Sequence, residues 1–225
     1  MEEVPSEDWV IDPPPGERAA DVQLDDLRRR VREENPQNSL KSAMVDYILS
    51  GAIRWWRCRD HETESRKKPN HAFMIHFSHL TAIHAEAEGI SGLSGEVEGL
   101  VNSAIHSTEL QQAISNRYWR ELHVACPMGD QIVEGYVDLV YENDGGLMVI
   151  DYKTDQIQPG EINAKVNHYR LQGATYAVAL EKVTRLPVVQ VSFAFLSTDS
   201  DAVFAPLPDL QGAIAEVYEV IEQEG

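Results

Sequence analysis

Residues 135–155 read GYVDLVYENDGGLMVIDYKTD, and this stretch decides the fold. Apolar residues alternate with polar ones before Asp144-Gly145 and form a short apolar run after it, as in two neighbouring strands. An Asp-Gly dipeptide between such segments indicates a two-residue hairpin loop of type I′, because both central residues must tolerate a positive φ. The sequence therefore predicts an antiparallel pair of strands closed by this turn.

The hairpin register decides which side chains meet. With Asp144-Gly145 as the loop, Asp138 lies directly opposite Asp151, and their Cβ atoms are about 4.5–5.5 Å apart on one face. A loop at Gly145-Gly146 would put Asp138 opposite Lys153 instead, with Asp151 still on that face. Lys153 follows Asp151 by two residues, so it points to the same side. Either register brings two carboxylates and an ammonium group together at one end of the hairpin.

Two carboxylates this close repel each other unless a cation lies between them, so we expect that removing Asp151 leaves the fold intact or slightly stabilised. Hard oxygen ligands on an open site suit Mg²⁺ or Mn²⁺. The backbone carbonyl of Tyr152 is a natural third protein ligand. A metal here would polarise a phosphoryl group and lower the pKa of a bound water, and Lys153 would orient that water or offset charge on the phosphate. A D-x-K triplet alone is common and fits an Asp–Lys pair on a solvated strand beside an unrelated turn acid, but the G-x-x-D at the matching hairpin distance favours a metal site.

The rest of the chain predicts a mixed α/β fold with helices covering a central sheet. Helical spacing and end signals indicate helices at 21–34, 39–56, 71–87, 95–106, 108–116, 161–183 and 209–223. Strand patterns fall at 118–126, 131–142, 147–154 and 188–196. We expect a disordered acidic leader at 1–20, a helical N-terminal region at 21–116 and a core at 117–225 that holds the three-strand meander, a helix, a strand and a last helix.

Composition restricts the environment and the partners. The sequence has no run approaching the ~18 apolar residues of a membrane helix and no secretory signal, which predicts a cytoplasmic protein without membrane association. Cys58 and Cys126 are too few for a four-cysteine metal or iron–sulfur site. Lys+Arg 19 against Asp+Glu 37 gives a formal net charge of −18, which counts against tight nucleic-acid binding by this chain alone.

The hairpin GYVDLVYENDGGLMVIDYKTD and the following HYRLQGATYAVAL resemble the RecB-like nucleases of the PD-(D/E)XK superfamily. The resemblance covers about residues 71–200 and is specific from 117 to 180. Such nucleases occur as C-terminal domains of bacterial recombination and repair helicases and sometimes as separate chains. The resemblance implies a restriction-endonuclease-like core and a Mg²⁺- or Mn²⁺-dependent deoxyribonuclease.

The resemblance also implies roles for individual residues. Asp138 of G-x-x-D and Asp151 of DYKT would bind the metal, and Lys153 would assist catalysis. Gln172 and Tyr176 match a Q-x-x-x-Y motif and lie at i,i+4 on one helical face, a pattern that a helix packing face with one buried amide would also produce.

Two further positions are less well defined. Glu121, in WRELHVA, stands where the family often has a glutamate leading into the first core strand, although a surface acid fits equally. A family histidine that adds a metal ligand is best matched by His71, but the Gly-Thr that usually precedes it is missing. His76, His79 and His84 crowd the same expected helix, where a histidine is more often a packing or surface residue.

The expected function is hydrolysis of DNA phosphodiester bonds, as an exonuclease-type activity on single strands or duplex ends in recombination and repair. No phosphate-binding loop of the G-x-x-x-x-G-K-[ST] kind occurs, so a helicase partner or a fused helicase domain would supply ATP hydrolysis. Two alternatives stay open: a catalytically weak docking or structural module of a helicase complex, and a phosphoesterase acting on a small substrate.

Overall fold

A computed structural model describes residues 78–79, 81–83, 85–87, 89–105, 107–129, 131–154, 157–158 and 160–224. All of them belong to the second of the two units into which the chain divides, Gln37–Gly225. The expected leader, the helices at 21–34 and 39–56, and His71 lie outside the described residues. No helix in the described ranges is long and apolar enough to cross a membrane.

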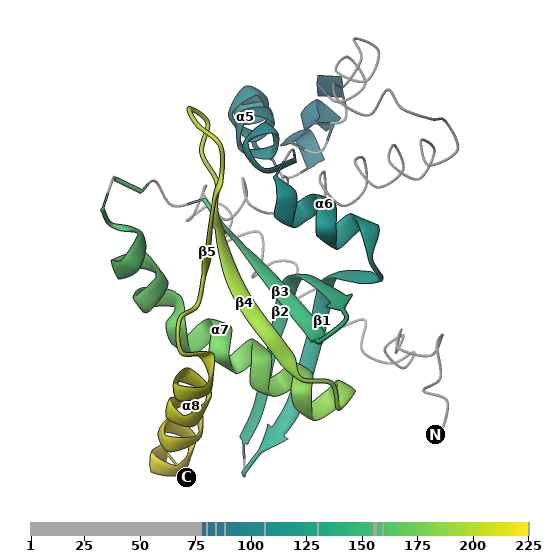
Figure 1. The fold of residues 1–225 in the computed structure, drawn as a ribbon. Coiled ribbons are helices and arrows are strands. Elements are labelled where there is room, and N and C mark those ends of the chain that lie inside the picture. The colour runs from purple at the N-terminus through teal and green to yellow at the C-terminus, as the bar shows by residue number, and fades with distance from the viewer. Residues whose placement is uncertain are drawn as a thin grey trace. The chain divides into compact units, whose positions relative to one another are not determined.

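The elements follow the expected order of helices, meander, helix, strand and helix, with one additional short strand before the last helix (Figure 1). The described residues between 78 and 87 are helical, and Gly89 follows with φ +73°, as expected for a helix C-terminus. The remaining elements are η2 (Ser91–Leu93), α5 (Ser94–Ile105), α6 (Thr108–Ser115), β1 (Tyr118–Met128), β2 (Gln131–Asn143), β3 (Gly146–Lys153), α7 (Ile162–Thr184), β4 (Val188–Phe195), β5 (Val203–Pro206) and α8 (Leu210–Glu224).

The five strands form one mixed sheet in the order β1-β2-β3-β4-β5. β1, β2 and β3 are antiparallel neighbours, β4 runs parallel to β3, and β5 is antiparallel to β4. The parallel pair needs a long connection, and α7 supplies it. β3 is buried on both faces, which explains why its sequence is a continuous apolar run rather than an alternating one.

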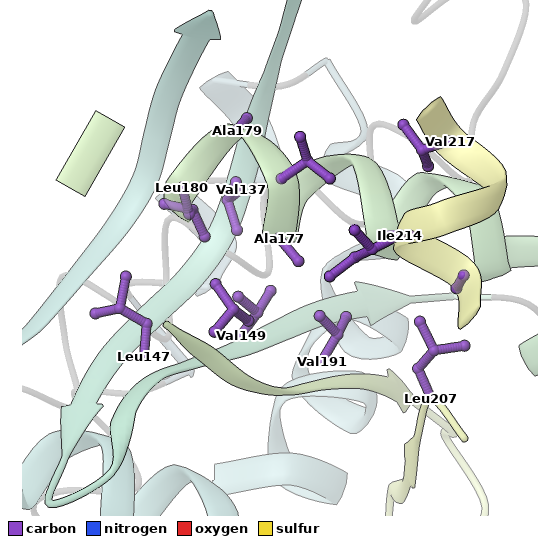
Figure 2. Packing of buried hydrophobic residues seen from close by; sticks show 14 of the residues in the cluster. Val137, Leu147, Val149, Ala177, Ala179, Leu180, Val191, Leu207, Ile214 and Val217 are labelled. Atoms are coloured by element: carbon purple, nitrogen blue, oxygen red, sulfur yellow. The ribbon is translucent and has the colours of Figure 1, made fainter. Parts of the chain in front are cut away.

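Each face of the sheet has its own hydrophobic core. Even-numbered residues of β3 such as Ile150 and Tyr152 pack with α5 and α6, and odd-numbered residues such as Val149 pack with α7 and α8. Figure 2 shows the second core, where Val149 and Val191 of the sheet lie under Ala177 of α7 and Ile214 of α8. The expected mixed sheet with helices on its faces is therefore confirmed.

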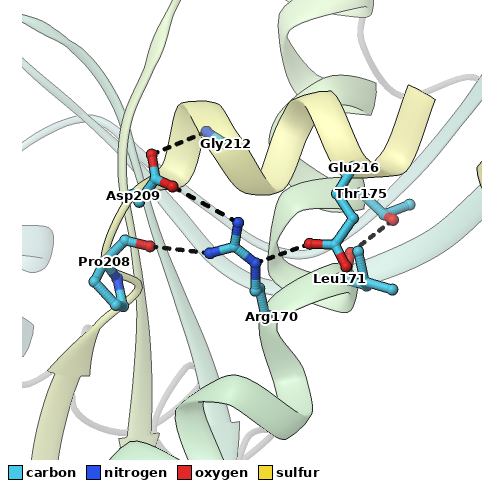
Figure 3. Close-up of polar contacts among 7 residues, drawn as sticks. All are labelled: Arg170, Leu171, Thr175, Pro208, Asp209, Gly212 and Glu216. Carbon is cyan, nitrogen blue, oxygen red and sulfur yellow. Dashed lines mark hydrogen bonds and ion pairs between the residues drawn. The ribbon is translucent and has the colours of Figure 1, made fainter. Parts of the chain in front are cut away.

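Arg170 ties α7 to α8 and the loop before it (Figure 3). Its Nε donates to Glu216 Oε2 at 3.0 Å, its Nη1 donates to the Pro208 carbonyl at 3.5 Å, and its Nη2 lies 3.8 Å from Asp209 Oδ2. Asp209 Oδ1 also accepts a hydrogen bond from the Gly212 amide at 3.1 Å. These contacts connect the polar side of α7 to α8 and to the loop before α8, while the apolar side of α7 faces the sheet.

The hairpin between β2 and β3 has the predicted register but another turn type. Asn143 pairs with Gly146 and Leu139 with Ile150, which excludes the alternative loop at Gly145-Gly146. Neither Asp144 nor Gly145 has a positive φ, so the type I′ prediction was wrong. Asn143 Oδ1 accepts from the Gly145 amide at 2.9 Å, and a side chain that caps its own turn in this way replaces the type I′ geometry.

β5 was not predicted from the sequence. It has four residues, lies at the edge of the sheet and ends in Pro206, which cannot donate a backbone hydrogen bond. Its only pattern signal is the apolar run Ala-Val-Phe-Ala before Pro206, which is too short to distinguish from a loop. Pairing with β4 therefore decides its conformation.

Candidate metal and catalytic site

Asp138 lies where the regular pairing of β2 is interrupted on both sides. The β1–β2 ladder pairs Arg120 with Leu139 and Leu122 with Val137 but skips the intervening Glu121 and Asp138. On the other side, the β2–β3 ladder ends at Leu139 and Ile150, one position before Asp138 and Asp151. The register matches the prediction, but the two aspartates do not form a regular ladder pair.

The strand irregularity also shifts which residues face α7. In β2, Val137 and Val140 both belong to the α7-side core, although strict alternation would put them on opposite faces. In β1, Trp119 and Leu122 show the same change of phase, and Glu121 between them has φ +43°. Such breaks in a ladder bend strands and re-aim side chains, and they are over-represented next to active sites.

The break turns the carboxylate of Asp138 towards β3. Asp138 Oδ2 accepts a hydrogen bond from the backbone amide of Tyr152 at 2.7 Å, taking the place of a β2 carbonyl in the ladder. In an antiparallel pair, the N–H and C=O of one residue point to the same neighbouring strand. The Tyr152 carbonyl therefore points to the β2 side, where the Asp138 carboxylate lies.

Asp151 and Lys153 form a buried ion pair. Asp151 is fully buried, Asp138 is 5% exposed and Lys153 is 6% exposed. Lys153 Nζ contacts Asp151 Oδ2, so the two side chains share a face of β3 as the two-residue spacing predicts. Two carboxylates and one ammonium group in the protein interior are costly to bury unless they hold one another or a ligand.

α7 adds a polar pair to this cluster. Lys153 Nζ donates to Gln172 Oε1 at 2.9 Å, and Gln172 Nε2 donates to the Tyr176 hydroxyl at 2.8 Å. The predicted i,i+4 pair therefore shares one helical face and reaches the lysine of the hairpin. The alternative of a plain packing face with a buried amide is not what the structure shows.

Two aromatic residues around the lysine were not predicted from the sequence. Lys153 Nζ lies 4.1 Å from the ring centroid of Tyr169 and 5.9 Å from that of Phe193. Cations are attracted to aromatic faces at such distances. Tyr169 could have been found, because it precedes Gln172 by three residues and so shares its helical face. Phe193 is brought in by the parallel pairing with Asp151, which the sequence does not specify.

The Tyr152 phenol lies on the opposite side of β3, in the core with α5 and α6. Its hydroxyl has no hydrogen-bond partner among the described residues. Burial raises the pKa of Tyr152 well above its usual value, and the negative charges of Asp138 and Glu121 raise it further. The phenol therefore stays protonated. It feels the charges of Asp138 and Glu121 but belongs to the hydrophobic core and not to the candidate metal site.

Some of the remaining candidate residues lie within the described part of the chain and others do not. Glu121 is exposed, and its backbone has a positive φ at the ladder break beside Asp138. Its role stays a prediction. His71 lies outside the described residues, as do His76 and His84, and His79 is exposed on its helix. Among the described residues, no three His, Cys, Asp or Glu side chains gather as a metal cluster. The candidate metal ligands among the described residues are therefore the carboxylates of Asp138 and Asp151 and the backbone carbonyl of Tyr152.

Comparison with known proteins identifies the family of this chain. The profile of the PD-(D/E)XK nuclease superfamily matches residues 52–223, so the chain belongs to that superfamily. An ATP-dependent helicase/nuclease subunit from a Thermoanaerobacter species is 40% identical over 52 residues, which are 23% of this chain and 4% of that protein. Its counterpart from Clostridium kluyveri is 30% identical over 95 residues, 42% of this chain and 7% of that protein.

The chain thus matches only a small part of these relatives. A solved structure described as a proposed exonuclease, from Eubacterium rectale, superimposes with a TM-score of 0.41 at 11% identity, over 99% of this chain and 84% of the other. The family assignment therefore rests on the profile match, and the fold assignment on the strand order and helix placement seen in this chain.

Proposed function

We propose that this chain is a metal-dependent deoxyribonuclease domain that hydrolyses phosphodiester bonds, with exonuclease-type action coupled to a helicase in DNA recombination and repair. The observation that carries the proposal is the hydrogen bond from the Tyr152 amide to Asp138 at the ladder break. It holds the Asp138 carboxylate against β3, on the side to which strand geometry directs the Tyr152 carbonyl, and Tyr152 lies between Asp151 and Lys153 in the sequence.

The donor set fits Mg²⁺ or Mn²⁺. Asp138, Asp151 and the Tyr152 carbonyl offer only hard oxygen atoms, and Mg²⁺ is commonly held by one or two carboxylates while it keeps several waters. His71 remains a proposed fourth ligand. When bound, such an ion would polarise a phosphate oxygen and lower the pKa of a bound water.

The chain's own residues would do the remaining work. Lys153 is held by Asp151 and Gln172 with its ammonium group at the edge of the carboxylate site. A fixed cation there would stabilise the negative charge that develops on the phosphate, without reorganising during the reaction. Tyr169 and Phe193 exclude water from one side of the ammonium group and so strengthen its field.

DNA delivery would depend on a partner. After Lys153 the chain has ten acidic residues and four basic ones, and nonspecific DNA affinity comes mainly from phosphate neutralisation by Lys and Arg. We infer that a helicase, fused or separate, supplies the affinity, and we propose that the domain acts in the cytoplasm. The matched relatives are subunits of ATP-dependent helicase/nucleases, and their combination of the two activities supports this inference.

Cleavage of labelled single-stranded and blunt duplex DNA in Mg²⁺ tests the proposal. We expect Asp138→Asn and Asp151→Asn each to lower the rate about a hundredfold or more, because each removes a charge that holds the ion. Asp144→Asn is the matched control, since it makes the same chemical change on the exposed hairpin turn and should leave the rate unchanged.

Two binding measurements separate the alternatives. Mg²⁺ should raise the melting temperature of the wild type and of Asp144→Asn but not of Asp151→Asn; an equal rise in Asp151→Asn would place the ion elsewhere. With Ca²⁺ replacing Mg²⁺ at about 0.1 M salt, the isolated chain should bind single-stranded DNA weakly. Metal binding without cleavage, even with a helicase present, would instead support the docking module that the net charge of −18 favours.

A further inference from the structure

Gly135 of the hairpin and Tyr176 of α7 make a close contact. A methyl group at Gly135 would lie 3.2 Å from Cε1 of the Tyr176 ring and 4.0 Å from Cδ1. Gly135 does not have a positive φ, so its backbone conformation is open to other residues. The glycine therefore provides space: without a side chain, it lets the tyrosine ring lie directly on β2.

Tyr176 in turn holds the side-chain amide of Gln172. Because Gln172 Nε2 donates to the Tyr176 hydroxyl, the other end of the amide, Oε1, faces Lys153 Nζ. A flipped amide would place an N–H₂ group against the ammonium group, and two donors cannot form a hydrogen bond. The lysine therefore selects this orientation of the amide, and the tyrosine hydroxyl holds the amide in place by accepting from its other end.

A second glycine sets the height of α7 above the sheet. A methyl group at Gly173, the residue after Gln172, would lie 2.9 Å from Phe193 Cζ and 3.0 Å from Val191 Cγ1. The helix backbone therefore approaches β4 more closely than any side chain would allow. Close packing at Gly173 fixes the position of α7, and the Tyr176 ring packs on Gly135. The Gln172 amide, which is bonded to that tyrosine, therefore has little freedom to move.

We propose that Gly135 and Tyr176 form a spacer that positions Lys153 through Gln172. Gly135 would then be a positioning residue for catalysis, and the glycine of G-x-x-D would be linked to the tyrosine of Q-x-x-x-Y by direct contact. This inference rests on the proposed nuclease function for its kinetic consequence, but the spacer itself can be observed in the metal-free protein.

Kinetics with saturating Mg²⁺ test the spacer. Gly135→Ala must displace the Tyr176 ring by a few tenths of an ångström, and we expect kcat to fall about three- to tenfold with KM for DNA unchanged. Tyr176→Phe keeps the ring on Gly135 but removes the hydroxyl, and it should lower kcat by about tenfold. Gly95→Ala is the matched control, because Gly95 is exposed on α5 with no atom near its Cβ position, and kcat should be unchanged.

A double-mutant cycle shows whether Gly135 acts through Tyr176. In a Tyr176→Leu background no ring atom opposes the new methyl group, so Gly135→Ala should cause less than a twofold further loss of kcat. An equal loss in both backgrounds would overturn the inference. Circular dichroism on each variant confirms that the comparison is made between folded proteins.

Nuclear magnetic resonance of ¹³C-labelled lysine in the metal-free protein gives a readout that does not depend on cleavage. The Lys153 signal, assigned by its loss in Lys153→Arg, should shift in Gly135→Ala and Tyr176→Phe but not in Gly95→Ala. An unmoved signal in Gly135→Ala would overturn the spacer. If the wild type fails to cut DNA with any divalent ion, the proposed function fails, while this measurement still decides the spacer.

Discussion

Asp151 and Lys153 place opposite charges side by side in the protein interior, and each therefore depends on the other for stability. Lys153→Met keeps the length of the side chain but removes the ammonium group from a fully buried carboxylate. We expect it to lower the free energy of unfolding in metal-free buffer by about 3–5 kcal/mol. Urea unfolding measures the change.

A double variant identifies the cause of that loss. Asp151→Asn combined with Lys153→Met leaves no charge of this pair buried, so it should be more stable than Lys153→Met alone. If the double variant loses as much as the two single variants together, the ion pair does not govern stability here. The structure also revises the sequence-based expectation for Asp151, because removing it now takes away the partner of a buried lysine as well as a repelling charge.

Individual site residues were predictable to different extents. Asp138, Asp151 and Lys153 could be placed because hairpin pairing and the two-residue repeat of a strand are local rules. The ladder break could not be predicted, since it depends on Glu121 and its neighbours in β1 as well as on β2. The roles of these residues in metal binding and catalysis stay predictions until the variants are measured.

At the scale of elements, the closeness of α7 to β4 depends on one glycine. Gly173→Ala should lower the free energy of unfolding by about 1–3 kcal/mol, because the new methyl group overlaps Phe193 Cζ and Val191 Cγ1. A gain of up to about 1 kcal/mol from the higher helix propensity of alanine partly offsets this loss. Thermal or urea unfolding checks the net effect.

Gly95→Ala again serves as the comparison. It makes the same substitution in a helix where nothing meets the added methyl group, and it should not destabilise the protein. A Gly173→Ala variant as stable as Gly95→Ala would mean that α7 can move away from the sheet without loss, contrary to the close packing seen here.

Helices and strands with strong periodicity were predicted well, and short ones were not. α7 and β3 have clear end signals and long patterns, and their bounds differ from the predicted ones by only one residue. β5 and the η2 turn are four and three residues long and are determined by packing against the rest of the fold. The hairpin turn shows that a dipeptide can predict register correctly while its backbone conformation is set by another residue, here Asn143.

At the scale of the whole molecule, buried neutral acids predict a loss of stability at alkaline pH. Burial raises the pKa of Tyr152, Tyr141 and Cys126, with carboxylates adding to the effect at both tyrosines and Lys182 partly opposing it at the thiol. In the unfolded chain these groups lose their protons first. Their contribution to stability is therefore fully present below their unfolded pKa values and declines as pH rises past about 9.

Tyr152→Phe tests the largest of these contributions. It removes a buried hydroxyl that has no hydrogen-bond partner among the described residues, so we expect about 1 kcal/mol or more of stabilisation at neutral pH. The fall in stability between about pH 9 and pH 11 should also become shallower. Urea unfolding across this range gives both values, and an unchanged slope would show that Tyr152 does not govern the alkaline limit.

The parallel pairing of β3 with β4 through α7 also has a consequence for how activity appears during folding. The hairpin that carries Asp138, Asp151 and Lys153 is local in sequence, and hairpins form within microseconds. Gln172 and Tyr176 reach the lysine only when the crossover has closed and β4 has docked, which is a slower, non-local step. We therefore expect Asp138 and Asp151 to come together early in folding and Lys153 to be positioned late. A newly made chain would then have no nuclease activity until α7 and β4 have docked.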